Sequence, residues 1–133
     1  MHESNVTDVI RAAEFRASLR EFLRKDERIA HDAGLTPQRY QLLLMIKGAP
    51  DRSQSANIGE LTQRLQLAQS TVTELVQRAI AVGLVDHDPA VHDGREVRVR
   101  LTPEGERRLA KAFSELSPER PRLAAALLGD LQM

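Results

Sequence analysis

The sequence predicts a mainly α-helical fold with one small β-hairpin, and three observations support this fold class. Apolar residues recur at helical spacing through most of the chain. Two short segments between residues 84 and 101 alternate apolar and charged side chains on either side of a polar tip. Thr-Pro pairs and single glycines stand where helices would begin and end. With 133 residues and 41% hydrophobic composition, the chain is long enough to bury a core as a single domain.

The N-terminal part predicts two helices, the first from Val6 to Ala30. Its apolar stripe drifts around the helix, so we expect one face to pack on the domain and another to meet a partner chain, with a single wide core face as the alternative. Gly34 is placed to take the left-handed backbone that ends many helices. Thr36 and Pro37 then predict the N-cap and first turn of the second helix. The expected buried residues of that helix are Tyr40, Leu43, Leu44 and Ile46.

Two shorter helices are predicted next, after a polar loop over residues 49–57 that has room for a brief edge strand. The first runs from Ile58 to Leu65, with Asn57 as its cap. The second runs from Gln69 to Ala81 and is ended by Gly83. The residues expected to face inward from these two helices are Ile58, Leu61, Leu65, Val72, Leu75, Val76 and Ile80.

The predicted hairpin pairs Leu84–Asp88 with Glu96–Leu101. In its second strand, alternation directs one set inward and the other outward: Val97, Val99 and Leu101 against Glu96, Arg98 and Arg100. Thr102 and Pro103 begin a further helix, and a last short helix is expected from Pro121 to Leu131. The apolar face of the former is Leu109, Ala112, Phe113 and Leu116. Helix, turn, helix and ribbon together have the layout of a winged helix-turn-helix, which presents one helix to a DNA major groove and a β-tip to the neighbouring backbone.

The second short helix carries candidate DNA-contacting residues on its outward face: Ser70, Thr71, Thr73, Glu74, Gln77 and Arg78. Arginine can bind guanine with two hydrogen bonds, glutamine can bind adenine, and glutamate can accept from cytosine. Ser70 and Thr71 stand near the helix start, where hydroxyl and backbone N–H groups donate to phosphate. A solvated helix face is the alternative. Glu74 would repel phosphate unless it meets a base edge, or it pairs with Arg78 four residues on.

The hairpin tip adds His92, Asp93 and Arg95 to the candidate DNA-binding residues. Arg95 is expected to enter an A·T-rich minor groove, where the negative potential is deepest. Asp93 can orient that guanidinium by a paired hydrogen bond. The alternative is an ordinary exposed turn, because Asp and Gly form turns in any protein.

The net charge of the winged region supports an alternative function. The chain has 19 basic and 19 acidic residues. From Ala56 to Gly105 there are five bases against seven acids, a net charge of −2. DNA-binding domains usually carry a basic surface. A protein-interaction module on a winged-helix fold that has lost DNA binding is therefore the alternative function.

Catalysis and metal binding have little support in the sequence. The chain has no Cys and shows neither a Ser–His–Asp set nor a Gly-rich phosphate loop, so we expect no enzyme and no cofactor. One hairpin cluster has the ligand types of a Zn or Mn site: Asp86, His87, Asp88, His92 and Asp93. Nothing in the sequence orients these side chains, so we expect no metal. The chain also lacks a membrane-span pattern and the basic-then-apolar order of a signal peptide, which favours a cytoplasmic protein with no membrane partner.

At the level of whole segments, the chain resembles the MarR family of winged-helix transcriptional regulators. The resemblance rests on LTPQRYQLLLMIKG, IGELTQRLQL, STVTELVQRAIAVGLV and VRLTPEG in this order, with Asp93 and Arg95 before the last. It implies a single winged-helix domain over residues 1–133, with a core at 35–105 and dimerisation helices at 6–31 and 103–131. The chain departs from the family at Glu74, where many members have a base, at the acidic segment 86–88, and in its short, proline-containing C-terminal helices.

What the resemblance implies for function is a sequence-specific DNA-binding transcriptional regulator. It would be a ligand-responsive repressor that acts as a homodimer on a pseudo-palindromic operator of double-stranded DNA. The usual effector in the family is a small, often aromatic molecule. By position, Ser70, Thr71, Thr73 and Gln77 fall where the family contacts DNA, while Asp93 and Arg95 fall on the wing.

Overall fold

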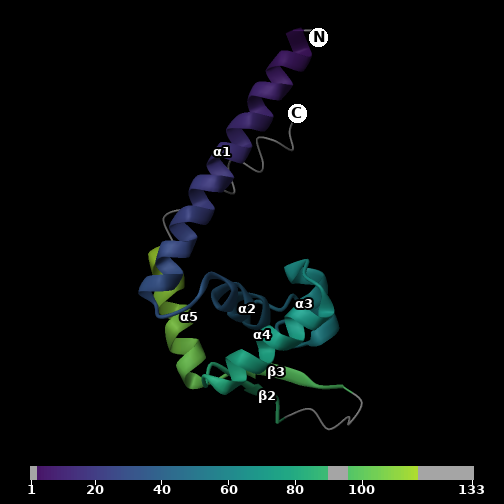
Figure 1. Cartoon of the computed structure of the whole chain (residues 1–133), viewed down its shortest axis with the longest axis vertical. Coiled ribbons are helices and arrows are strands. Elements are labelled where there is room, and N and C mark those ends of the chain that lie inside the picture. Colours follow the sequence, from purple (N-terminus) through teal and green to yellow (C-terminus); the bar gives the residue numbers. More distant parts are fainter. Residues whose placement is uncertain (1–2, 90–95, 117–133) are drawn as a thin grey trace.

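The computed structural model describes residues 3–89 and 96–116. The wing tip and the last predicted helix, from Pro121 to Leu131, lie outside the described residues. In chain order the described elements are α1 (Glu3–Asp32), α2 (Pro37–Lys47), β1 (Ser55–Asn57), α3 (Ile58–Leu65), α4 (Gln69–Ala81), β2 (Val85–His87), β3 (Arg98–Leu101) and α5 (Pro103–Leu116). Figure 1 shows α2, α3 and α4 gathered above the small sheet. The mainly helical fold class is confirmed.

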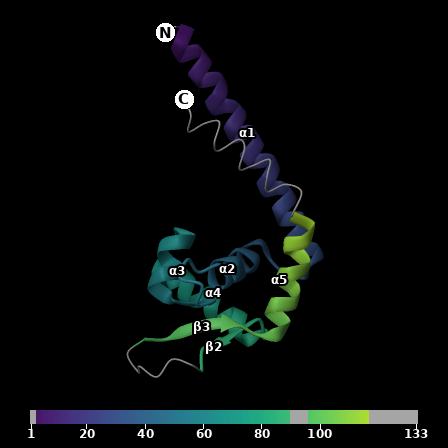
Figure 2. The same ribbon diagram turned by 180° about the vertical axis from the view of Figure 1, so that it is seen from behind.

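Helix α1 extends well beyond the rest of the described chain (Figures 1 and 2). Its last turns pack against α2 and α5, and it is followed by Gly34 with φ +76°, as predicted. The apolar residues of its projecting half are exposed instead: Val6, Val9 and Ile10. The drift of the apolar stripe therefore separates a half that packs on the domain from a half that carries these exposed residues.

A carboxyl group is buried where α1 meets α2. Asp26 is only 7% exposed. Burial raises the pKa of this carboxyl to about 6, while a hydrogen bond with Tyr40 opposes the rise and the negative charge of Glu27 adds to it. Near neutral pH the junction therefore holds a charge that has lost most of its hydration.

Helix α2 begins as its sequence predicts. The Thr36 hydroxyl accepts a hydrogen bond from the Arg39 N–H at 3.1 Å, and Pro37 is the first helical residue. The prediction for its buried side needs one addition and one correction. Leu42 is fully buried, whereas Leu44 is only half-buried because it lines an open cavity beside α5.

The sheet has a third strand, in the order β1-β3-β2. Strand β1 lies at the end of the predicted loop and pairs antiparallel with β3, with Asn57 opposite Arg98. The hairpin partner β2 places His87 opposite Val99. Val97 was expected inward, and that prediction is wrong: its side chain is 56% exposed. It precedes the first paired residue of β3, so the alternation that buries Val99 does not reach a covered part of the sheet.

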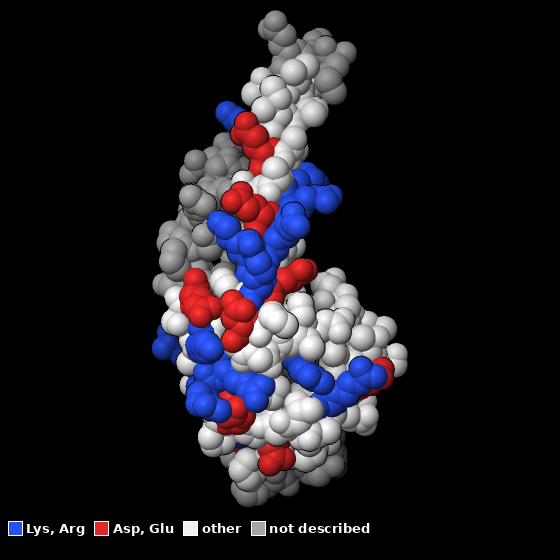
Figure 3. Space-filling model, turned by 60° about the vertical axis from the view of Figure 1, so that its left-hand side comes forward, with Lys and Arg blue, Asp and Glu red and all other residues white. Residues whose placement is uncertain are grey.

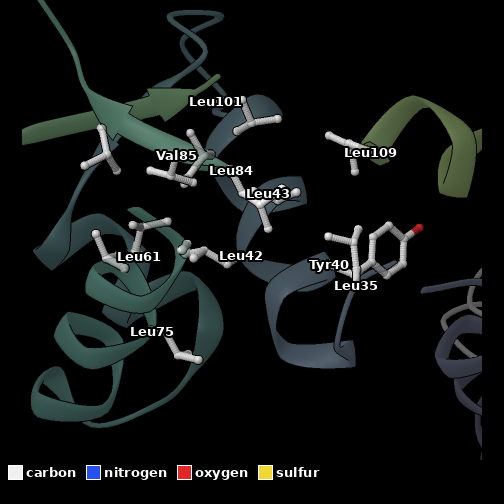
Figure 4. Packing of buried hydrophobic residues seen from close by; sticks show 14 of the residues in the cluster. Leu35, Tyr40, Leu42, Leu43, Leu61, Leu75, Leu84, Val85, Leu101 and Leu109 are labelled. Carbon is white, nitrogen blue, oxygen red and sulfur yellow. The ribbon is translucent and has the colours of Figure 1, made fainter. Parts of the chain in front are cut away.

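The core lies between the three central helices and one face of the sheet, with α5 closing it (Figure 4). Helix α5 is tied to the end of α4, because the Thr102 hydroxyl donates to the Gly83 carbonyl at 2.6 Å and accepts from the Gly105 N–H at 3.1 Å. A Cβ at Gly105 would come within 2.1 Å of the Leu84 carbonyl oxygen, so this approach requires glycine. Three residues predicted to face inward, Ile58, Leu65 and Ile80, are half-buried and pack against the core, whereas the inward prediction for Phe113 is wrong because its side chain is exposed.

Candidate nucleic-acid interface

The first helix of the helix-turn-helix, α3, is capped at both ends. The Asn57 side chain accepts from the Glu60 N–H at 2.8 Å, and the Glu60 carboxylate accepts from the Asn57 N–H at 3.0 Å. This reciprocal capping box satisfies two backbone donors that a helix start otherwise leaves open. At the other end Gln66 takes a left-handed conformation, with φ 56°. That residue turns the chain sharply from α3 toward α4.

The outward face of α4 holds the six predicted DNA-contacting residues. Val72, Leu75, Val76 and Ala79 are buried on the other side of the helix. Of the six, Ser70, Glu74, Gln77 and Arg78 are exposed, and Thr71 and Thr73 are half-buried. From Ser70 to Arg78 the helix rises about 12 Å, close to the ~12 Å width of a B-DNA major groove. The structure thus brings these side chains together on one accessible face.

The start of α4 has no side-chain cap. Its N-cap residue is Ala68, with extended backbone at φ −63° and ψ 146°, and the first turn contains no acidic residue. The first helical hydrogen bond runs from the Val72 N–H to the Ala68 carbonyl at 3.1 Å. Within the described chain, the backbone N–H groups of residues 69–71 donate to no other group. Three donors and the positive end of the helix dipole are therefore available to an anion such as phosphate.

Glu74 and Arg78 form the ion pair that their spacing predicts. The Arg78 Nη2 to Glu74 Oε1 distance is 2.6 Å, and the two side chains are 66% and 60% exposed. Such an exposed pair contributes only ~0.3–0.5 kcal/mol to helix stability. Arg78 can therefore exchange this carboxylate for a base edge or a phosphate at small cost.

Two arginines of the winged region are committed to the protein itself. Arg64 donates to the Gly48 carbonyl at 3.1 Å, at the end of α2. Arg98 was expected to point outward, and that prediction is wrong: its side chain is 16% exposed and pairs with Glu60 and Glu96. Arg98 is already counted in the net charge of −2, and its group with Glu60 and Glu96 keeps one unit of negative charge at the start of α3. On the face shown in Figure 3, basic and acidic side chains are interspersed along α1.

The wing residues of the predicted site, His92, Asp93 and Arg95, lie outside the described residues. The described part of the hairpin cluster is on and beside β2, where Asp86 accepts from the His87 N–H at 2.8 Å. Among the described residues, no three His, Cys, Asp or Glu side chains are placed to hold a metal ion. Nor does any helix in residues 3–89 or 96–116 have the length and apolar character to cross a bilayer.

Sequence reasoning missed two features of this surface. The capping box had a readable signal, since Asn followed three residues later by Glu before an apolar run is its signature. The uncapped start of α4 was implicit in the predicted first residue, Gln69, which the structure confirms: it places Ala68, whose side chain cannot accept a hydrogen bond, at the N-cap.

Comparison with known proteins identifies the group to which this fold and surface belong. A model of the MarR family matches residues 33–96. YsmB of Bacillus subtilis (strain 168), an uncharacterised HTH-type transcriptional regulator, is 34% identical over 93 residues, and the match covers 68% of this chain. The chain spans only 60% of the length of that relative.

Solved structures agree on the fold. A MarR family protein from Bacillus stearothermophilus has a TM-score of 0.70 at 26% identity, over 90% of this chain and 79% of that one. A mutant of S. aureus MepR bound to an oligodeoxyribonucleotide has a TM-score of 0.65 at 17% identity, over 86% of this chain and 81% of that one. The second likeness is one of fold alone. With its capped α3, exposed α4 face and three-stranded wing sheet, this chain belongs to the MarR family of winged-helix transcriptional regulators.

Proposed function

We propose that the chain is a sequence-specific DNA-binding transcriptional regulator that acts as a homodimer on a pseudo-palindromic operator. One observation carries the proposal. The outward face of α4 combines base-reading side chains with an uncapped, acid-free N-terminus. The MepR mutant, a protein of the same fold, is described in its complex with an oligodeoxyribonucleotide, which supports DNA binding by a protein of this fold.

Major-groove reading is assigned to Gln77 and Arg78, with Glu74 released from its ion pair to accept from cytosine. Ser70, Thr71 and Thr73 donate to the backbone together with the free N–H groups of the first turn. On the wing, Arg95 enters the minor groove, Asp93 orients it, and His92 contacts the backbone. These roles extend the helix contacts to the neighbouring groove.

The homodimer is proposed from the projecting half of α1. Val6, Val9 and Ile10 are exposed at a spacing that places them on one face. Each such side chain contributes about 1.5–3 kcal/mol when fully buried, so covering this face with a second copy favours association. Two copies would present two α4 helices to successive major grooves of a pseudo-palindromic site.

Repression relieved by a small effector is the remaining part of the proposal. An open cavity of about 360 Å³ lies between α2 and α5, with Leu44, Leu109 and Phe113 among its lining. At its edge the Lys47 ammonium is 2.9 Å from the Glu106 carboxylate. A small aromatic acid fits this chemistry, because its ring can pack on the apolar lining while its carboxylate meets Lys47.

The test is fluorescence anisotropy of the full chain on duplex DNA from the region upstream of its own gene, against a scrambled duplex, at two salt concentrations. Regulators of this type bind the first duplex in preference, and binding weakens as salt rises. An interaction module on the same fold would show no salt-sensitive binding to either duplex. Light scattering on the same sample gives the mass, which decides between one and two copies.

A further inference from the structure

Arg98 joins three separate segments of the winged region. Its guanidinium donates to the Ser55 side-chain and carbonyl oxygens at 3.0 and 2.9 Å, on β1. It also donates to Glu60 Oε1 at 2.9 Å, in the first turn of α3, and to Glu96 Oε1 at 2.8 Å, just before β3. One planar side chain on the wing strand thus contacts the strand beside it and the helix beyond that strand.

The same network includes the cap of α3. The Asn57 side-chain amide donates to Glu96 Oε1 at 2.6 Å, while its oxygen caps α3. Hydrogen bonds from Asn57 and then Arg98 hold the pKa of the Glu96 carboxyl below its ordinary value. Glu96 is the first described residue after the wing tip. Its carboxylate is therefore ionised and is held at the start of α3 by these hydrogen bonds.

We propose that Arg98 is a positioning residue for DNA binding, which fixes the wing strand to the start of α3 and makes no phosphate contact itself. The inference rests on the proposed function, since positioning matters only if the wing and α4 meet one duplex together. Two carboxylates already surround the guanidinium, and its side chain is 16% exposed. Turning it toward a phosphate would leave both carboxylates and the Ser55 carbonyl without their charged donor.

Arg100 provides a matched control on the same strand. It is two residues away and points to the same side of the sheet, yet it is exposed and makes no ion pair within the described chain. Replacing either arginine by methionine removes one positive charge from β3. Only the replacement of Arg98 removes the link to α3.

Two variants of Arg98 test the proposal on DNA. Arg98→Met should weaken duplex binding by about tenfold and leave the salt dependence unchanged, because positioning is lost but no phosphate contact is. Loss of a phosphate contact would lower the slope of log affinity against log salt by about 0.9 per protomer. Arg98→Lys should not restore binding, because one ammonium cannot replace the fork that reaches Ser55, Glu60 and Glu96 together. A phosphate contact would tolerate lysine.

Amide hydrogen exchange of the free protein tests the link without DNA. Arg98→Met should speed exchange at Ser55–Asn57 and in the first turn of α3, with α4 unchanged, and Arg100→Met should match wild type. A reduced salt slope, rescue by lysine, wild-type affinity in Arg98→Met, or unaltered exchange would each overturn the proposal. Failure of the wild-type chain to bind any duplex would refute the proposed function, and with it positioning for DNA, whereas the exchange result would still report whether Arg98 holds β3 to α3.

Discussion

The two helices of the helix-turn-helix begin in opposite ways. Helix α3 begins with a complete capping box, in which Asn57 and Glu60 exchange hydrogen bonds, and with Arg98 on the same carboxylate. Helix α4 begins at Ala68, whose side chain cannot accept a hydrogen bond. Both helices lie in one motif and are separated by a turn of a few residues, so the difference is local.

The difference determines what the N–H groups at each helix start can do: those of α3 help to hold the fold together, whereas those of α4 remain available to a ligand. Every helix leaves four N–H groups at its start without a partner inside the helix. In α3 the protein supplies partners for two of them, and Glu60, which accepts one of these hydrogen bonds, is joined to the sheet by Arg98. In α4 part of the set is left for a partner from outside, and omitting a cap costs about 1 kcal/mol of stability. We infer that this loss is offset when a phosphate oxygen binds there.

The largest effect is expected from giving α4 the cap it lacks. Ala68→Asp would satisfy the first-turn donors and raise the free energy of unfolding by about 1 kcal/mol. Its carboxylate would also face the phosphate, so duplex affinity should fall by a hundredfold or more, since like charges brought together cost several kcal/mol. Ala68→Asn is the matched control, with the same cap and no charge, and should lose much less affinity. Equal affinity in all three proteins would show that DNA does not use this helix start.

The converse change removes the cap from α3. Asn57→Ala should lower the free energy of unfolding by about 1–2 kcal/mol, because it deletes the helix cap and the donor to Glu96. Asn57→Ser separates these contributions, because serine keeps the cap and loses the amide donor. Chemical denaturation measures both variants. If Asn57→Ala is as stable as wild type, the cap at the start of α3 does not contribute to the stability of the fold.

A smaller effect is expected from a substitution on the outward face of α4. Glu74→Gln breaks the exposed pair with Arg78, so the free energy of unfolding should fall by only ~0.3–0.5 kcal/mol. Duplex affinity should fall only on sites that carry the cytosine assigned to Glu74, because a glutamine amide does not replace the two accepting oxygens of the carboxylate. A rise in affinity on every duplex would instead mean that Glu74 only repels the DNA backbone.

The smallest effect concerns pH. The lowered pKa of Glu96 adds stability that is present above its ordinary value of 4.5 and is lost as the pH falls through the lowered value. Asp26 acts in the opposite direction, because its pKa is raised from 3.8 to about 6 and its cost grows as the pH rises through that range. Asp51 and Glu104 also have lowered pKa values, so the contribution of Glu96 is obtained by difference, from thermal melting between about pH 5 and pH 3 of Asp26→Asn with and without Glu96→Gln. There Glu96→Gln should flatten the acid-side loss, and an unchanged profile would contradict the fixed carboxylate.

The sequence predicted the helices well because their signals are local. Thr36 with Pro37 and Thr102 with Pro103 mark two starts, and Gly34 and Gly83 mark two ends with positive φ. Outward positions on α4 followed from its apolar spacing. Each of these signals depends on neighbours within one or two turns, so no knowledge of the rest of the fold was needed.

The errors concern contacts between distant segments. Strand β1 could be anticipated only as room for a brief edge strand in the loop, because three residues carry little periodicity and its partner β3 is about 40 positions away. Alternation in β3 was extended to Val97, where the strand is no longer covered. Arg98 was assigned to solvent, because its partners Ser55 and Glu60 are brought to it only by the sheet register.

The most direct test of α4 as the reading helix is to measure which base pair Gln77 reads. Competition binding with all single-base variants of the preferred duplex, for wild type and Gln77→Ala, gives that assignment. We expect Gln77→Ala to lose discrimination at one base pair in each half-site, by about 1–3 kcal/mol, and to keep nonspecific binding. An equal loss of affinity on every duplex, or none on any, would contradict α4 as the reading helix.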